Sequence, residues 1–199
     1  MTGLIIGIIV GTLIATVRVL PKYKTLPKVL NGICSFYVAL FRGTPMVVQL
    51  LVFYYVLFPI IGLKITGVQV AMLVFGLNSG AYISEIMRSG IQSVDSGQME
   101  AGRAVGLSFG TSMMKIVIPQ AVKNILPALC NEFISLLKET SISGYIGLMD
   151  LTKGGDIIRS VTYEAFMPLI AVAVIYLLMV VGLSKAVGVL ERKLRNNER

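Results

Sequence analysis

Polar side chains recur at helical spacing inside two long apolar stretches of the chain. Successive members lie three or four residues apart, which places them on one face of a helix. The members are Asn78, Tyr82, Glu85 and Ser89 in the first stripe, and Gln120, Asn124, Asn131 and Ser135 in the second, where Pro127 fills the missing turn. Amide, hydroxyl, phenol and carboxylate groups can hydrogen-bond a polar solute, so the stripes predict the lining of a path for such a solute.

Burial within the protein gives a second interpretation of the same stripes. A charge at the centre of a membrane span costs at least about 2.5–3.5 kcal/mol, so Glu85, and Glu132 beside the second stripe, must face protein or water. Hydrogen bonds between helices or a seam between subunits would satisfy them equally well. For Glu85 in particular, pairing with Arg88 three residues later on the same face is the favoured alternative.

Enzymatic chemistry has little support in the composition. The chain contains no histidine, and its two cysteines, Cys34 and Cys130, are far apart in apolar surroundings. The sequence therefore has no Ser-His-Asp arrangement and no histidine metal ligand, and it also lacks the phosphate-binding pattern GxxxxGK[ST]. We expect no catalytic residue, no metal site and no cofactor on this chain, so any ATP must be hydrolysed by another one.

The elements that position the stripes are membrane helices. Hydrophobic residues make up 55% of the 199 residues and charged residues only 14%. Residues 165–183 include no charge, and residues 46–63 include only Gln49 as a polar side chain. Unbroken apolar runs of this length indicate membrane-spanning helices rather than the alternating strands of a barrel. The fold class is therefore all-α, as a polytopic membrane protein.

We expect about five spans in a single transmembrane domain over residues 1–199, at about 2–20, 44–62, 67–90, 115–138 and 165–187. The first run is short for a span. Residues 26–41, which Asn31, Gly32 and Ser35 interrupt, either extend the second span or lie at the membrane interface.

Orientation follows from the basic residues, which are Lys22, Lys24 and Lys28 after the first span and Arg192, Lys193, Arg195 and Arg199 in the tail. Placing them in the cytoplasm puts the N-terminus outside and the C-terminus inside, with 63–66 and 139–164 external and 91–114 cytoplasmic. The net charge of +8 is thus explained by membrane flanks, and we expect no nucleic acid partner.

The cytoplasmic segment 91–114 carries the signals of a short helix. Asp95 with Gln98 three residues later suits an N-cap with its return partner, and Gly106 suits a C-terminal stop. We therefore expect an amphipathic helix over about 95–108, held beneath the bilayer between two spans.

This region resembles the EAA motif of bacterial ABC importer permeases. The resemblance rests on Glu100-Ala101-Gly102, then Gly106, then the run from Ile116 to Pro119, with glycine in place of the motif's second alanine and Ile118 in place of its leucine. Three further stretches resemble the polar amino acid importer subfamily: Phe41-Arg42-Gly43-Thr44-Pro45 with Gln49-Leu50, Asn78-Ser79-Gly80-Ala81-Tyr82 with Glu85-Ile86, and Leu137-Lys138-Glu139-Thr140-Ser141.

The resemblance implies a type I ABC importer permease in the bacterial cytoplasmic (inner) membrane, surrounded by lipid. It implies that Glu100, Ala101, Gly102, Gly106 and Pro119 couple the chain to an ATPase. The implied partners are a cytoplasmic ABC ATPase dimer that binds ATP and Mg²⁺, a second permease chain (identical or paralogous), and an extracytoplasmic substrate-binding protein.

A polar amino acid is the expected substrate, and its two charges need both acceptors and donors. The candidate acceptors are Glu85, Glu139 and Asp150, and the candidate donors are Asn78, Ser79, Tyr82 and Thr140. A channel or an ion-coupled carrier acting alone is the alternative function. It would explain the polar stripes but not the capped cytoplasmic helix.

Overall fold

A computed structural model describes the backbone of residues 2–19 and 25–196 and the side chains up to Arg192. Of the basic flanks, Lys22, Lys24 and Arg199, together with the side chains of Lys193 and Arg195, lie outside this part. The described chain is helical and has no strand. The α-helices are α1 Thr2–Val19, α2 Thr25–Gly43, α3 Met46–Val52, α4 Phe58–Ile60, α5 Gly67–Gln92, α6 Ser96–Ala104, α7 Phe109–Ser112, α8 Ile118–Glu139, α9 Leu151–Thr162 and α10 Phe166–Asn196; η1 Phe53–Leu57 and η2 Met113–Val117 are π-helical, and η3 Thr140–Ile146 is a 3₁₀ helix.

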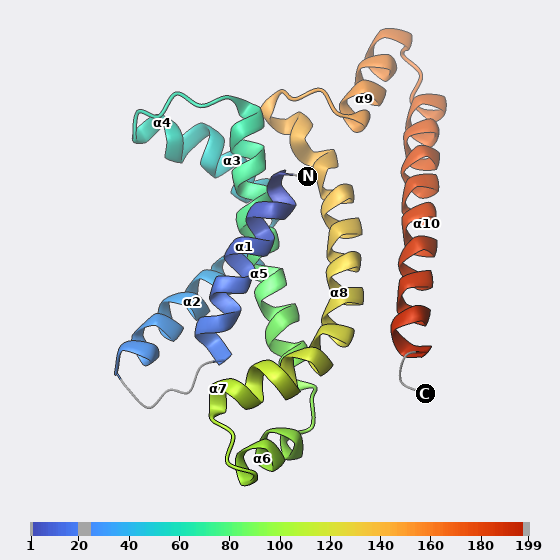
Figure 1. Cartoon of the computed structure of the whole chain (residues 1–199). Coiled ribbons are helices and arrows are strands. Elements are labelled where there is room, and N and C mark those ends of the chain that lie inside the picture. Colours follow the sequence, from blue (N-terminus) through green and yellow to red (C-terminus); the bar gives the residue numbers. More distant parts are fainter. Residues whose placement is uncertain (1, 20–24, 197–199) are drawn as a thin grey trace.

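The helices form a bundle with two distinct ends (Figure 1). Helices α6 and α7 lie at one end, close to where α1 and α5 finish, and α9 lies at the opposite end, beside the start of α10; α1 begins in that half of the bundle. Helix α10 packs on α8 and α9 and is largely exposed along its length, with Leu177 and Leu178 each about 60% exposed or more. Such an apolar, unburied surface suits lipid or another membrane chain.

The most extensive helix–helix contact among the described residues is a seam of small residues between α1 and α5. Every fourth residue of α1 is buried there: Gly3, Gly7, Gly11 and Ala15. A Cβ atom added at Gly11 would lie 2.6 Å from Ile83 Cγ2, and one added at Gly76 would lie 2.7 Å from Ile6 Cβ. The two backbones can therefore approach closely only because glycine occupies these positions, as in small-xxx-small membrane packing.

Three described helices are long and apolar enough to cross a membrane: α1, α5 and α10 up to Arg192. The pair formed by Thr25–Gly43 and Met46–Ile60, bent by 106°, counts as a fourth if it is one span. The expected span at 44–62 thus begins at a bend, and residues 26–41 form most of a continuous helix before it. The expected span at 115–138 lies within η2 and α8, whose Lys123, Asn124 and Glu132 make it less apolar than the others.

Polar side chains fix the corner between α2 and α3. Gln49 Nε2 donates to the carbonyls of Phe41 (2.8 Å) and Thr44 (3.0 Å), which lie at the end of α2 and in the turn. Asn78 Nδ2 of α5 donates to Gln49 Oε1 at 2.9 Å and to Phe41 O at 3.2 Å. Carbonyl groups that the break in the helix leaves without a helical partner are therefore satisfied by buried amides.

Both π-helical segments end two residues before a proline. The Phe58 amide donates to Phe53 O ahead of Pro59, and the Ile118 amide donates to Met113 O ahead of Pro119. Proline has no amide hydrogen, and its ring would clash with the carbonyl four residues earlier in a regular α-helix. A π-turn is a common way to accommodate such a disruption without ending the helix. The second proline of this region, Pro127, lies inside α8.

Candidate functional site: an inter-helix groove and a coupling helix

A groove of about 450 Å³ opens between the end of α2, the last turns of α5 and the first half of α8. Its lining brings members of both polar stripes to one space. The lining residues are Arg42, Tyr82, Glu85, Ile86, Ser89, Gly90, Ser93, Asn124 and Ala128. Across the groove, Asn124 Nδ2 donates to Ser93 Oγ at 2.9 Å.

Glu85 lies among three arginines. Arg88 donates to Glu85 Oε2 from Nη2 at 2.6 Å and from Nε at 3.2 Å, so the alternative of a pair within α5 is confirmed. Arg18, at the end of α1, donates to the other carboxylate oxygen, Oε1. Both oxygens of Glu85 are thus occupied, and the carboxylate is a structural tie between α1 and α5 rather than a free acceptor for a solute.

Arg42 is the third arginine and is held more loosely. Its Nη1 lies 3.8 Å from Glu85 Oε2, beyond hydrogen-bonding distance. Its guanidinium lies over the Tyr82 ring, with Cζ 5.2 Å from the ring centroid, which is a cation–π geometry. The side chain is 43% exposed, against 14% for Arg18 and 29% for Arg88. The sequence named this residue only as part of a family motif and gave it no role in the path.

Asn78 and Ser79, two other expected path residues, point elsewhere. Asn78 is 3% exposed and is used in the α2–α3 corner, so its expected role as a path donor is replaced by a structural one. Ser79 is fully buried and donates to Glu132 Oε1 of α8 at 3.0 Å. This bond places the Glu132 carboxylate against α5, four residues along α8 from Ala128 of the groove.

The remaining expected path residues lie beyond the groove, at the end that carries α9. Thr140 Oγ1 donates to Leu137 O at 2.7 Å, and Glu139 is the last residue of α8. Asp150 caps α9 by accepting the Lys153 amide at 3.0 Å, while its Oδ2 is buried with no partner among the described residues. The structure therefore divides the expected path residues among the groove, the buried contacts of Asn78 and Ser79, and the end that carries α9.

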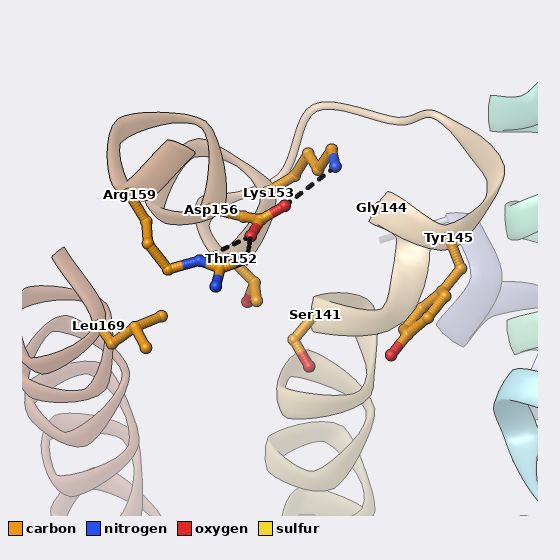
Figure 2. Close-up of a pocket in the computed structure, with 8 residues that line it drawn as sticks. All are labelled: Ser141, Gly144, Tyr145, Thr152, Lys153, Asp156, Arg159 and Leu169. Atoms are coloured by element: carbon orange, nitrogen blue, oxygen red, sulfur yellow. Dashed lines mark hydrogen bonds and ion pairs between the residues drawn. The ribbon is translucent and has the colours of Figure 1, made fainter. Parts of the chain in front are cut away.

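A second pocket, of about 370 Å³, lies beside these residues between η3, α9 and the start of α10 (Figure 2). Asp156 lies there between Lys153 Nζ, at 3.2 Å, and Arg159 Nη2, at 2.6 Å. These two cations, the Arg159 hydrogen bond above all, lower the pKa of the exposed Asp156 carboxyl below its ordinary value. Among the described residues there is no group of three or more His, Cys, Asp or Glu side chains that could hold a metal ion.

Helix α6, at the other end of the bundle, matches the expected cytoplasmic helix. Asp95 caps it by accepting the Gly97 amide at 2.6 Å, although the Gln98 side chain is bonded to Gln120 rather than returning to the cap. At its C-terminus Gly106 has φ +88°, and the Leu107 and Gly106 amides donate to Gly102 O and Arg103 O. This is a Schellman motif, and it needs glycine at its left-handed position.

Gly102 holds α6 against the following helix. It is the one buried residue of α6, and a Cβ atom there would lie 2.8 Å from both Ile116 Cδ1 and Ser112 Oγ. The glycine that departs from the EAA pattern thus permits close packing on η2. The opposite side of α6 is exposed: Glu100, Ala101 and Ala104 are all exposed, and Val105 is 78% exposed. Pro119 is also exposed, in the first turn of α8.

Comparison with known proteins identifies the family to which this chain belongs. Residues 3–196 match the family described as "Binding-protein-dependent transport system inner membrane component". The chain belongs to this family. This inner membrane component is 39% identical over 192 residues to the putative glutamine transport system permease protein GlnP of Rickettsia bellii, covering 96% of this chain and 86% of that one. It is also 39% identical over 194 residues to the arginine transport system permease protein ArtQ of Bacillus subtilis, covering 98% and 88%.

Solved structures of ABC transporters contain chains with the same fold. A chain from the crystal structure of an amino acid ABC transporter with histidines superimposes with a TM-score of 0.88 at 42% identity, covering 96% of this inner membrane component and 87% of that chain. A chain of the MetNI methionine ABC transporter in an inward-facing conformation shares the fold, with a TM-score of 0.75 at 22% identity. The expected fold, an all-α ABC importer permease of type I, is confirmed, and the chain is a transport subunit of the inner membrane.

Proposed function

We propose that this permease moves a polar amino acid across the bacterial cytoplasmic membrane as part of an ATP-driven importer. Relatives named for glutamine and arginine transport support this substrate class. ATP and Mg²⁺ bind to a separate ATPase dimer, and this chain binds no cofactor of its own. An extracytoplasmic binding protein delivers the amino acid, and a second permease chain, identical or paralogous, completes the path.

Helix α6 is the observation that carries this proposal. It has a cap at each end and packs closely on η2 at Gly102, so η2 and α8 are the elements that would receive a displacement of α6. Its exposed side combines the Glu100 carboxylate with the small apolar surface of Ala101, Ala104 and Val105. An apolar helix face outside the bundle needs a protein partner, and we assign that face to the ATPase.

The physical mechanism is a shift between two states. Closure of the ATPases on ATP moves α6, which transmits the displacement through η2 to α8 and to the groove that α8 shares with α5. The closed ATPases must favour one state of the bundle by differential contact energy. Converting a population of 1:99 into 99:1 takes about 5.5 kcal/mol.

Orientation in the membrane follows from this assignment. If α6 is cytoplasmic, α10 ends in the cytoplasm, while α9 and the start of α1 face outside (Figure 1). This agrees with the N-out, C-in orientation expected from the basic flanks, and it places the pocket around Asp156 on the side of the binding protein.

The test is Glu100→Lys in the complete complex, with Glu191→Lys as the matched control. Glu191 is exposed on α10 at the same end of the bundle but on a different helix. We expect Glu100→Lys to abolish ATP hydrolysis stimulated by the loaded binding protein, and Glu191→Lys to leave it intact. Gly106→Glu should behave like Glu100→Lys because its left-handed backbone disfavours any side chain.

Membrane insertion and a monodisperse elution profile of each variant exclude unfolding as the cause. Normal stimulation and co-purification of the ATPase with both Glu100→Lys and Gly106→Glu would show that α6 is not the docking helix. Uptake of radiolabelled amino acid by the permease without any ATPase would favour the alternative, a carrier or channel acting alone.

A further inference from the structure

We infer that Arg42 and Glu132 form a subsite for the charged backbone of the transported amino acid, with Arg42 binding its carboxylate and Glu132 its ammonium group. The inference rests on the proposed function and gives a substrate-binding role to two residues that the sequence patterns did not select for it. It is based on which charged groups around the groove already have hydrogen-bond partners within the protein and which do not.

The guanidinium of Arg42 has N–H donors that no described residue uses. Glu85 is already hydrogen-bonded by Arg18 and Arg88, and the Arg42 guanidinium makes no hydrogen bond to any residue that the structure describes. Three arginines face the Glu85 carboxylate here, so positive charge exceeds negative charge around Glu85. A partly buried cluster of this kind is stabilised by an added anion, and a guanidinium binds a carboxylate through two parallel hydrogen bonds.

The position of the Arg42 guanidinium also suits it to bind a carboxylate. Its guanidinium faces the groove from the last turn of α2, supported from below by the Tyr82 ring. The contact with Tyr82 orients the planar group without using any of its N–H donors, because a cation–π interaction is made through the face of the guanidinium. A guanidinium held in this way can exchange water for a solute carboxylate at little cost in side-chain entropy.

Glu132 supplies the opposite charge. Ser79 of α5 fixes its Oε1 at 3.0 Å, and Tyr82, three residues further along the same helix, carries the Arg42 guanidinium over its ring. Residues three apart on a helix lie on one face, so α5 holds the two groups on the same side. Asn124, Ala128 and Glu132 lie at intervals of four residues, which puts Glu132 one turn beyond the groove wall on the same face of α8. An α-amino acid carries its carboxylate and its ammonium on one carbon atom, so it offers a group of opposite charge to each residue of this pair.

The substrate class follows from this chemistry. A subsite that reads only the two backbone charges discriminates amino acids from amines, sugars and metal ions, but it does not discriminate one side chain from another. Side-chain selection then belongs to other contacts, including those of the binding protein. An anionic lipid headgroup could also bind the Arg42 guanidinium, and nanodiscs of neutral or anionic lipid distinguish the two ligands.

The experiment is equilibrium binding of radiolabelled glutamine to the permease–ATPase complex in nanodiscs of neutral phosphatidylcholine, without the binding protein. We expect saturable binding that unlabelled glutamine displaces and glutamine methyl ester, which lacks the carboxylate charge, does not. Arg42→Gln should weaken binding at least about tenfold, since hydrogen bonds to a charged group are lost. Arg42→Lys should fall in between, because a point charge replaces the fork.

Glu132→Gln should weaken binding comparably, while its amide oxygen can still accept from Ser79. Arg192→Gln, at an exposed position of α10, is the matched control and should bind like the wild type. Co-elution of the ATPase with each variant in size-exclusion chromatography reports that the complex is assembled.

Wild-type affinity in Arg42→Gln, equal displacement by the methyl ester, or no binding to the wild-type complex would each overturn the subsite. Loss of glutamine binding on adding anionic phosphatidylglycerol would assign Arg42 to lipid and overturn it as well. Glutamine uptake by wild-type proteoliposomes with the binding protein is scored separately. Its presence keeps the proposed function even when the subsite fails, and the absence of uptake for any amino acid refutes the function itself.

Discussion

Replacing Gly11 with valine tests the seam between α1 and α5. The first added atom, Cβ, would lie 2.6 Å from Ile83 Cγ2, 2.8 Å from Ile83 Cβ and 3.0 Å from the Gly80 carbonyl oxygen. Carbon atoms pack best at about 3.5–4.0 Å, so the helices must separate by roughly 1 Å or Ile83 must move. Ile83 is fully buried, and the Gly80 oxygen belongs to backbone, so neither can yield easily.

The expected magnitude combines two opposing effects. Overpacking costs about 1–3 kcal/mol, while replacing glycine by valine in a helix returns only a few tenths of a kcal/mol. The net destabilisation is therefore about 1–2 kcal/mol. For a domain of this length, that lowers the midpoint of thermal unfolding by roughly 2–8 °C.

The assay is loss of the monodisperse elution peak of the detergent-purified protein after heating, with all variants heated at one rate because unfolding of such proteins is often irreversible. Gly188→Val is the matched control, since no neighbouring atom lies within 4 Å of a Cβ added there. If Gly11→Val melts at the same temperature as Gly188→Val and the wild type, the close approach of the two helices is refuted.

Two further predictions concern topology and the α2–α3 corner. In a Cys34→Ser, Cys130→Ser background, we expect a membrane-impermeant maleimide to label Lys64→Cys but not Arg192→Cys from outside intact cells. The reverse pattern would invert the proposed orientation. Asn78→Leu should lower stability by about 1–3 kcal/mol, because it leaves buried Gln49 Oε1 without its donor. Asn131→Leu, on the exposed part of the second stripe, should melt like the wild type, and equal midpoints for both variants would argue against the buried amide network.

Local signals allowed the cytoplasmic helix to be predicted well. A capping aspartate, a glycine stop and the intervening small residues act within about ten positions of one another, and the structure has α6 where they lie. The long apolar helices were predictable for the same reason. The stop at Gly106 even required the left-handed backbone that is found there.

Contacts between distant positions were not predictable in this way. The pairing of Asn78 with Gln49 spans 29 residues, and its partner carbonyls become available only because the chain bends between α2 and α3. The polar stripe in α5 therefore contained two residues, Asn78 and Glu85, whose side chains bond neighbouring helices. Helical periodicity identifies the polar face of a helix but not the group that faces it.

Two signals in the sequence were available and were not used. The spacing of Gly3, Gly7, Gly11 and Ala15 is a packing pattern for membrane helices. Arg42 was noticed only as part of a family motif, because a basic residue near a helix end is usually a membrane flank. Its significance depends on how Arg18 and Arg88 use the Glu85 carboxylate, which only a three-dimensional arrangement can show.

The π-turn before Pro119 also sets the rotational phase of α8 relative to α6. A π-turn contains one residue more than the α-helical turn it replaces, and each residue of an α-helix corresponds to about 100° of rotation. If this segment returned to regular α-helix by losing one residue, everything after Ile118 would rotate by about that angle around the helix axis. Asn124 would then turn away from Ser93, and Glu132 away from Ser79. The extra residue at Met113–Val117 therefore rotates α8 relative to η2. With this rotation, the continuous η2–α8 segment packs on α6 at its beginning and turns its polar face toward α5 further along.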